Sequence, residues 1–132
     1  MKIITTSGKR KQAIARANLR EGKGRIRINS QLLSAYGNEL TRIRIMEPLI
    51  LAGDFAKGFD IGIKVHGGGW QSQAEACRLA IAKGLVEASR GKQLKQTFLD
   101  YDRNLLVADV RRNEPHKPND SKPRKKRQFS KR

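Results

Sequence analysis

Acidic residues, cysteine and aromatic side chains are all scarce in this sequence. Of its 132 residues, 12 are Asp or Glu and 29 are Lys or Arg, which gives a formal net charge of +17. The single cysteine, Cys77, has no partner for an internal disulfide, as expected in a reducing compartment. No apolar run approaches the roughly 20 residues of a membrane-spanning helix, and Met1–Thr6 lacks the apolar segment of a signal peptide. These absences predict a cytoplasmic chain with no membrane partner.

The positive charge is concentrated at the two ends of the chain. Residues 1–30 carry a net charge of +8 and residues 111–132 another +8, whereas residues 31–110 carry only +1. A chain this cationic repels itself unless an anionic partner neutralises it. Its length suits one domain with a single modest core, followed by an appendage. We therefore predict a globular domain over residues 1–110, a basic C-terminal tail over residues 111–132, and a polyanionic partner.

The C-terminal segment lacks the apolar side chains that it would need to fold alone. It holds ten Lys or Arg residues against two acids, and Phe129 is its only sizeable apolar side chain apart from the prolines. Its three prolines remove backbone donors and favour extended geometry, so a helix is disfavoured. Such a segment is expected to be disordered alone and to become ordered on a polyanion. A solubilising role and a nuclear-import signal in residues 122–127 are the alternatives that the tail leaves open.

Alternating apolar and polar residues predict strands in the N-terminal half. Residues 3–6 form a short β-prone stretch that ends at Ser7 and Gly8, and residues 13–29 alternate on both sides of a turn-like sequence at 21–24. We interpret residues 13–29 as a β-hairpin with an almost acid-free polar face. Together with the cationic residues 9–11, this face favours phosphate contact over simple solvation. Its arginines are Arg16, Arg20, Arg25 and Arg27.

Helices dominate the rest of the predicted domain. Short helices are expected over residues 31–36 and from Pro48 to near Gly53, and the stretch between them, 42–45, fits a helix or a strand. Residues 59–66 alternate as a clear strand. A long helix over 71–89 has a narrow stripe of small apolar residues, and a second helix follows from 92 to about 100. A last apolar run at 105–108, strand or short helix, is expected to hold the tail's origin to the core.

Three consecutive glycines, Gly67, Gly68 and Gly69, lie between the clear strand and the long helix. The dinucleotide fingerprint needs a glycine at its sixth position, where this chain has Ser72, and the P-loop ending is absent. Free N–H groups at a helix N-terminus favour a phosphate, so the glycines fit an RNA phosphate contact. A tight strand-to-helix connection explains them as well. Trp70 next to them fits either stacking on a base or covering the edge of the core.

No catalytic or metal-binding constellation is present in the sequence. His66 lies on the polar face of its strand, His116 lies in the tail, and neither has metal-ligand spacing with Cys77. Cys77 lies on the packing stripe of the long helix, which favours a small core residue over a nucleophile. The sequence therefore predicts a protein that is not an enzyme and has no cofactor, metal or small-molecule substrate.

Residues 7–17, 65–76 and 128–132 read SGKRKQAIARA, VHGGGWQSQAEA and QFSKR. They resemble, in this order, the opening, the strand–triple glycine–helix signature and the terminal peptide of the universal ninth protein of the small ribosomal subunit, in its archaeal branch. Ser72 and Glu75 stand where many members of that family have glycine. Because the three stretches span nearly the whole chain, their combination is far more specific than any one of them.

The resemblance implies a small α+β fold, with a mixed sheet and helices on one face, like the second domain of the fifth small-subunit protein. It also implies a place in the head of the small subunit, among other head proteins and on rRNA of the 3′ major domain, with the tail reaching P-site tRNA. The rRNA contacts expected from the resemblance and the charge pattern are Lys9, Arg10, Lys11, Arg16, Arg25, Arg27, Gly67, Gly68, Gly69, Arg111, Arg112, Lys122, Arg124, Lys125, Lys126 and Arg127. The expected tRNA contacts are Ser130, Lys131 and Arg132.

Two other classes of RNA- or DNA-binding protein compete with this interpretation. The protein subunit of an RNA-processing ribonucleoprotein enzyme is the first, since such a small basic domain can share a related fold. A chromatin-like DNA binder is the second, but it would need a groove-reading helix, and the long helix here is apolar rather than basic.

Overall fold

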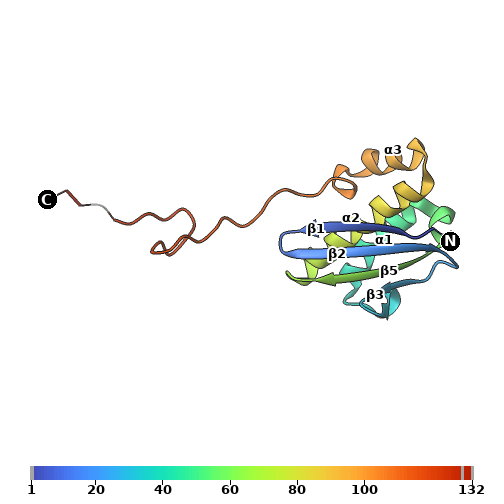
Figure 1. Cartoon of the computed structure of the whole chain (residues 1–132), viewed down its shortest axis with the longest axis horizontal. Coiled ribbons are helices and arrows are strands. Elements are labelled where there is room, and N and C mark those ends of the chain that lie inside the picture. Colours follow the sequence, from blue (N-terminus) through green and yellow to red (C-terminus); the bar gives the residue numbers. More distant parts are fainter. Residues whose placement is uncertain (1, 129, 132) are drawn as a thin grey trace.

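The described residues form one mixed sheet of five strands in the order β1-β2-β5-β3-β4. Figure 1 labels the first four strands of this order. The strands are β1 (Ile4–Arg10), β2 (Ala13–Glu21), β3 (Ile26–Ile28), β4 (Gln31–Leu32) and β5 (Phe59–His66). Strand β5 pairs antiparallel with β2 and parallel with β3, so the most C-terminal strand lies in the middle of the sheet. This computed structural model describes residues 2–128, 130 and 131. It confirms the predicted mixed α+β class.

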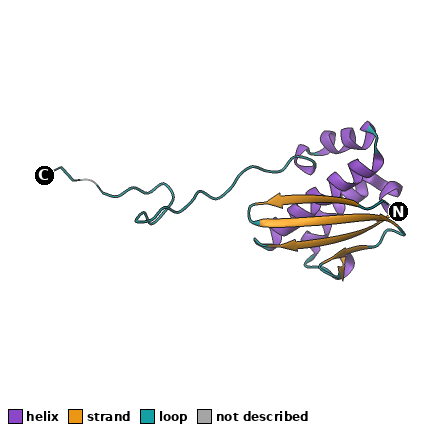
Figure 2. Ribbon diagram, viewed as in Figure 1, coloured by secondary structure: helices purple, strands orange, loops and turns teal. Residues whose placement is uncertain are grey.

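The helices lie together on one side of this sheet, as Figure 2 shows. They are α1 (Glu39–Ala52), α2 (Trp70–Ser89) and α3 (Lys92–Tyr101), with short 3-10 turns η1 (Leu33–Ala35), η2 (Gly53–Gly58) and η3 (Arg103–Leu105). Helix α2 packs on β1 and β2, while α1 and α3 pack against α2. The long helix and the helix after it were predicted to within one residue at each end. The triple glycine therefore connects the central strand directly to the central helix.

Small side chains set the spacing between the sheet and α2. Ala13, Ala15 and Ala17 on β2 are fully buried against the helix side of the sheet. Residues at every second position of a strand share a face, so the alternate residues of β2 point to the opposite, open side. Gly8 on β1 comes closest to the helix, because a Cβ there would lie 2.2 Å from Ala76 O and 2.9 Å from Ala80 N.

Replacing Gly8 with alanine is expected to lower the free energy of unfolding by about 1–3 kcal/mol, because the added methyl group meets helix backbone that cannot rotate away. Gly62→Ala is the matched control: Gly62 lies on β5, and a Cβ there meets nothing within 4 Å. Urea denaturation of both variants checks this prediction. Equal stabilities would show that the sheet and α2 can separate freely at this point.

Two sequence-based expectations about strands are wrong. The first strand does not end at Ser7 and Gly8 but continues to Arg10, so Lys9 and Arg10 lie on β1. Residues 13–29 do not form a hairpin, because β2 pairs with β1 and β5 while β3 pairs with β4 and β5. Central strand β5 brings a longer alternating apolar face than β3 offers, and it takes the position beside β2.

The region between β3 and β5 also differs from expectation. Residues 31–36 form β4 and η1 rather than a helix, and residues 39–52 form one continuous helix that includes Pro48. Asn38 caps this helix, since its side chain accepts a hydrogen bond of 2.9 Å from Thr41 N. No apolar stripe marks α1 in the sequence, because Leu40, Ile43 and Ile50 are exposed while Ile45 is buried.

After η3 the described residues form no further helix or strand, and Figure 1 draws them running away from the body. Leu105 is fully buried and Leu106 packs against the core, as expected of the run that holds the start of this segment. Among the described helices, none combines the length and the apolar character that crossing a membrane requires.

Candidate nucleic-acid interface

The open side of the sheet carries a row of cationic side chains from four strands and the loop before β3. We call these side chains the sheet face. Strand register fixes their order, because Arg16 on β2 lies opposite Lys64 on β5, and Arg27 on β3 lies opposite Gly62 on β5. All are exposed, and none has an ion-pair partner within the described part of the chain. The sheet face consists of Lys9, Arg16, Arg20, Arg25, Arg27 and Lys64.

A shallow hollow of about 440 Å³ lies in the middle of the sheet face, with Arg20, Arg25, Arg27 and Lys64 around it. Gly62 contributes to its floor, where the missing side chain leaves open space. Like charges placed directly opposite on neighbouring strands destabilise a sheet, and Arg16 and Lys64 are such a pair. The sheet face therefore attracts an anion to the place where its own charges repel each other.

Asp60 is the acid that lines this hollow, and its carboxylate is hydrogen-bonded to the backbone. Its Oδ1 accepts hydrogen bonds of 2.9 Å from the N–H groups of Lys23 and Arg25. The hydrogen bond from Arg25 N is the main cause that lowers the pKa of Asp60. Asp60 thus orders the loop before β3 and places Arg25 on the sheet face, instead of presenting a free negative charge.

The loop of three glycines packs against the turn between β1 and β2. Gly67 has a φ of 78°, and a Cβ there would lie 2.4 Å from Gln12 O. Gly68 has a φ of 62° and would bring a Cβ to 3.1 Å from Ala13 N. Close packing therefore accounts for the first two glycines, as the tight-connection alternative predicts. Gly69 has open space around it and precedes the first turn of α2. Lys11 lies across the same loop.

Arg10 lies on the helix side of the sheet, away from Lys9. Its Nε donates to Glu75 Oε2 at 2.7 Å, and its guanidinium lies 3.4 Å from Asp109. Arg111 binds the same Asp109 at 2.8 Å, and this hydrogen bond is the main cause that lowers the pKa of Asp109 well below its usual range. Two of the expected rRNA contacts, Arg10 and Arg111, therefore already have carboxylate partners at the start of the C-terminal segment.

A buried arginine, Arg78, joins α1, α2 and the residue before η3. Arg78 is 5% exposed, and its Nε donates to Glu47 Oε2 at 2.7 Å. Its second terminal nitrogen lies 3.1 Å from Asp102 Oδ2. Burial raises the pKa of Asp102, but hydrogen bonds from Asn104 N and Arg78 outweigh it and leave the pKa lowered. These ion pairs fix α1 and η3 against α2.

The remaining expected contacts lie in the exposed C-terminal segment. Arg124 is paired with Glu114, with its Nε 2.8 Å from Oε1. Arg132, the last of the expected tRNA contacts, falls outside the described residues. The others are exposed, and the cations among them have no ion-pair partner among the described residues: Arg112, Lys122, Lys125, Lys126, Arg127, Ser130 and Lys131.

Sequence reasoning missed Lys64 as a member of the sheet face. The signal was present, because residues 59–66 alternate and Lys64 falls on their polar face. The row of arginines was placed on one face correctly although their strands were paired wrongly, since alternation assigns a face whatever the neighbouring strand.

Nothing in the described residues is arranged for catalysis. Cys77 is fully buried, and burial raises the pKa of its thiol to about 12, which disfavours the reactive thiolate. No group of three or more metal-ligating side chains occurs in residues 2–128, 130 and 131.

A small α+β domain with an unpaired cationic sheet face and a basic C-terminal segment has the charge distribution that favours a polyanionic partner. The comparisons with known proteins identify its family. The family "Ribosomal protein S9/S16" matches residues 8–132, and the chain belongs to this family. Three relatives, each called "Small ribosomal subunit protein uS9", come from three strains of Methanococcus maripaludis. Each is 49% identical over 132 residues, covering 98% of this chain and 98% of the relative.

Membership confirms the family that the three sequence stretches indicated. The family is one of structural ribosomal proteins and not of enzymes, which agrees with the prediction of a non-enzyme and leaves the RNA-processing enzyme subunit without support. Ribosomes lie in the cytoplasm, so the predicted location is confirmed as well.

Proposed function

We propose that this chain is a structural constituent of the small-subunit head that binds small-subunit rRNA and, through its C-terminal residues, P-site tRNA. The sheet face and the loop of glycines beside Lys11 contact rRNA in this proposal. The names of the relatives, all small ribosomal subunit proteins, support the assignment. Neighbouring head proteins, and likeness to the second domain of the fifth small-subunit protein, remain predictions.

The unpaired sheet face is the observation that carries the rRNA part of the proposal. Six exposed cations share one side of the sheet, and two of them, Arg16 and Lys64, are direct cross-strand neighbours. Such an arrangement costs stability in the free protein. RNA phosphates compensate for it, because each Lys or Arg contact releases condensed counterions. Phosphate contacts fix the position of a protein on RNA without reading its sequence.

The proposed division of the chain assigns residues 111–132 to an extended tail. Twenty-two extended residues reach about 70 Å, well beyond the radius of the body. Residues 111–127 would follow rRNA, and the terminal residues 130–132 would reach tRNA. Contacts to phosphate suit this task, since the P site accepts every tRNA.

Co-sedimentation with small subunits in rising salt tests the rRNA assignment. The chain is expected to stay with purified subunits at salt concentrations that remove a free peptide of residues 111–132, because the folded sheet face adds contacts to those of the tail. Release of the chain and the peptide at the same salt concentration would contradict a role for the body.

Deleting residues 130–132 is expected to speed dissociation of tRNA from the P site several-fold and to leave assembly of the subunit unchanged. The deletion removes two cations at the tip, Lys131 and Arg132. About two fewer phosphate contacts should also make the dissociation rate less dependent on salt. Filter binding of tRNA to programmed small subunits measures both quantities.

The matched control replaces Lys125 and Lys126 with glutamine, which removes the same charge from the part of the tail assigned to rRNA. This variant should release tRNA at the normal rate. If both variants release tRNA equally fast, the tip has no special role, and unchanged release after the deletion would rule out the tRNA contact.

A further inference from the structure

Trp70 is the only tryptophan of the chain and is half exposed at the first residue of α2. It belongs neither to the buried core nor to the half-buried side chains that pack on it. Covering the core edge therefore does not explain this residue. Instead, Trp70 lines two hollows of different chemistry.

The first hollow, of about 330 Å³, lies at the N-terminus of α2. Gly69 caps the helix without a side-chain hydrogen bond, and the first turn contains no acid. The first helical hydrogen bond there is donated by Gln73 N to Gly69 O at 2.9 Å. The N–H groups of the three residues before Gln73 therefore lack helical partners and attract an anion. Lys11 lines the same hollow and adds a full positive charge.

Ser72 supplies an independent sign of a ligand in this hollow. The residue is 9% exposed and lines the hollow, and its hydroxyl makes no hydrogen bond within the described part of the chain. Among the described residues no fully buried side-chain oxygen or nitrogen lacks a partner, so this hydroxyl keeps some exposure and is available to a ligand in the hollow that the residue lines. A phosphate oxygen at the helix N-terminus would accept the hydrogen bond that this hydroxyl otherwise lacks.

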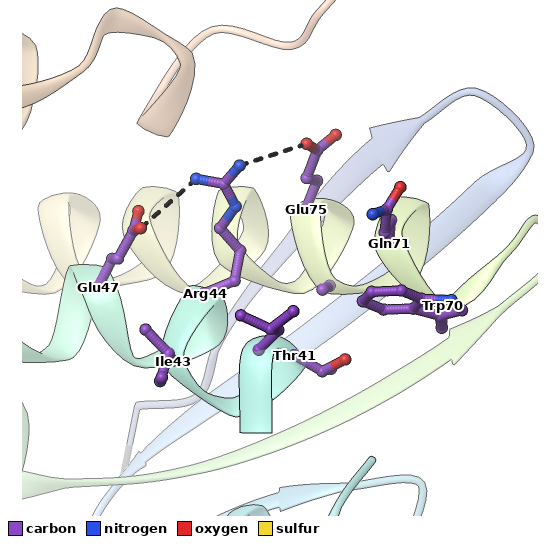
Figure 3. Close-up of a pocket in the computed structure, with 9 residues that line it drawn as sticks. Thr41, Ile43, Arg44, Glu47, Trp70, Gln71 and Glu75 are labelled. Atoms are coloured by element: carbon purple, nitrogen blue, oxygen red, sulfur yellow. Dashed lines mark hydrogen bonds and ion pairs between the residues drawn. The ribbon is translucent and has the colours of Figure 1, made fainter. Parts of the chain in front are cut away.

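The second hollow, of about 390 Å³, is also lined by Trp70 and lies between α1 and α2 (Figure 3). Leu40, Ile43 and Ala74 give it apolar walls. The carboxylates of Glu47 and Glu75 also line this hollow and repel phosphate. Arg44 lies 3.5 Å from Glu47 and 3.9 Å from Glu75 and partly neutralises them. Such a surface suits an uncharged aromatic ring rather than an RNA backbone.

We propose that these two hollows hold one unpaired RNA nucleotide, with its phosphate at the N-terminus of α2 and its base stacked on Trp70. The inference rests on the proposed function and adds the class of nucleotide to it. Paired bases are stacked within a helix and cannot present a face to an indole, whereas bases of loops and bulges can. Trp70 lines both a cationic hollow that suits a phosphate and an apolar hollow that suits a base, and a nucleotide requires this combination.

Trp70 fluorescence in the full chain tests the proposal, because no other tryptophan contributes. A single-stranded hexauridylate is expected to quench the emission, whereas an RNA duplex of equal length should bind through the sheet face without quenching. Fluorescence anisotropy of end-labelled hexauridylate then measures affinity, with an expected loss of about 5- to 150-fold for Trp70→Ala. Ser72→Ala and Lys11→Gln should weaken binding with unchanged melting temperature.

Lys83→Gln is the matched control for Lys11→Gln, because it removes one cation from the far half of α2 and should leave quenching unchanged. Normal RNA binding by the wild-type chain without quenching, or equal quenching by the duplex, would overturn the nucleotide site and leave the proposed function intact. Protection of Trp70 only in assembled subunits, with no response to RNA alone, would indicate a protein partner and would also overturn it. If the wild-type chain binds neither the single-stranded RNA nor the duplex, both the nucleotide site and the proposed function are contradicted.

Discussion

Replacing Arg78 with alanine is expected to lower the free energy of unfolding by about 3 kcal/mol. The guanidinium is 5% exposed and holds Glu47 and Asp102 at 2.6 Å and 3.1 Å. Removing one partner of a buried ion pair leaves carboxylates without compensation, at a typical cost of about 3–5 kcal/mol. The lower end applies because both carboxylates retain some contact with water. A domain of this size should melt about 10 °C earlier.

Arg44→Ala is the matched control for this prediction. Arg44 approaches Glu47 and Glu75 only to 3.5 Å and 3.9 Å, and 48% of its side chain is exposed. Exposed pairs contribute less than about 1 kcal/mol, so this variant should melt close to the wild type. Calorimetry of both variants decides the question. Equal melting temperatures would mean that Arg78 does not hold α1 and η3 against α2.

Replacing four arginines of the sheet face with glutamine is expected to reduce the salt dependence of rRNA binding. The log–log slope of affinity against salt should become shallower by about 3.6, since each phosphate contact contributes about 0.9. Between 50 and 200 mM salt the wild type should then lose about 150-fold more affinity than the variant. Fluorescence anisotropy with a labelled fragment of the 3′ major domain measures both slopes. The replaced residues are Arg16, Arg20, Arg25 and Arg27.

The control for this variant removes the same number of charges from exposed positions away from the sheet face, at Lys57, Lys92, Lys95 and Arg103. This control should retain the wild-type slope. The sheet-face variant should also fold at least as stably as the wild type, because Arg16→Gln relieves the repulsion opposite Lys64. Equal slopes for the two variants would show that net charge alone, and not the sheet face, determines RNA binding.

Local patterns predicted the elements whose apolar residues have one clear period. Strand β5 alternates throughout, and α2 carries its stripe of small residues, so both were found from the sequence. Of helix α1 only the part after Pro48 was predicted as a helix, because exposed Leu40 and Ile50 blur the period and because Pro48 suggested a start rather than an interior.

The pairing of strands could not be obtained from the sequence in the same way. Strands β2 and β3 are neighbours in sequence, and both alternate, so a hairpin was the local interpretation. Their true neighbour β5 begins more than 30 residues after β3, and nothing within either strand specifies this distant partner. The side of the sheet on which Arg10 lies depends on the length of β1. This strand continues through Gly8, where the absence of a side chain lets the helix backbone come close.

The central position of β5 also determines when the cationic surface comes into existence during synthesis. A ribosome that has made the first 58 residues has synthesised β1 to β4, but not yet the strand that joins β2 to β3. Lys64 then comes to lie beside Arg16 in the same step that completes the sheet, and long-range pairings of this kind form late. Nascent chains therefore present the complete sheet face only after β5 is in place, and under the proposed function rRNA would bind finished domains in preference to unfinished ones.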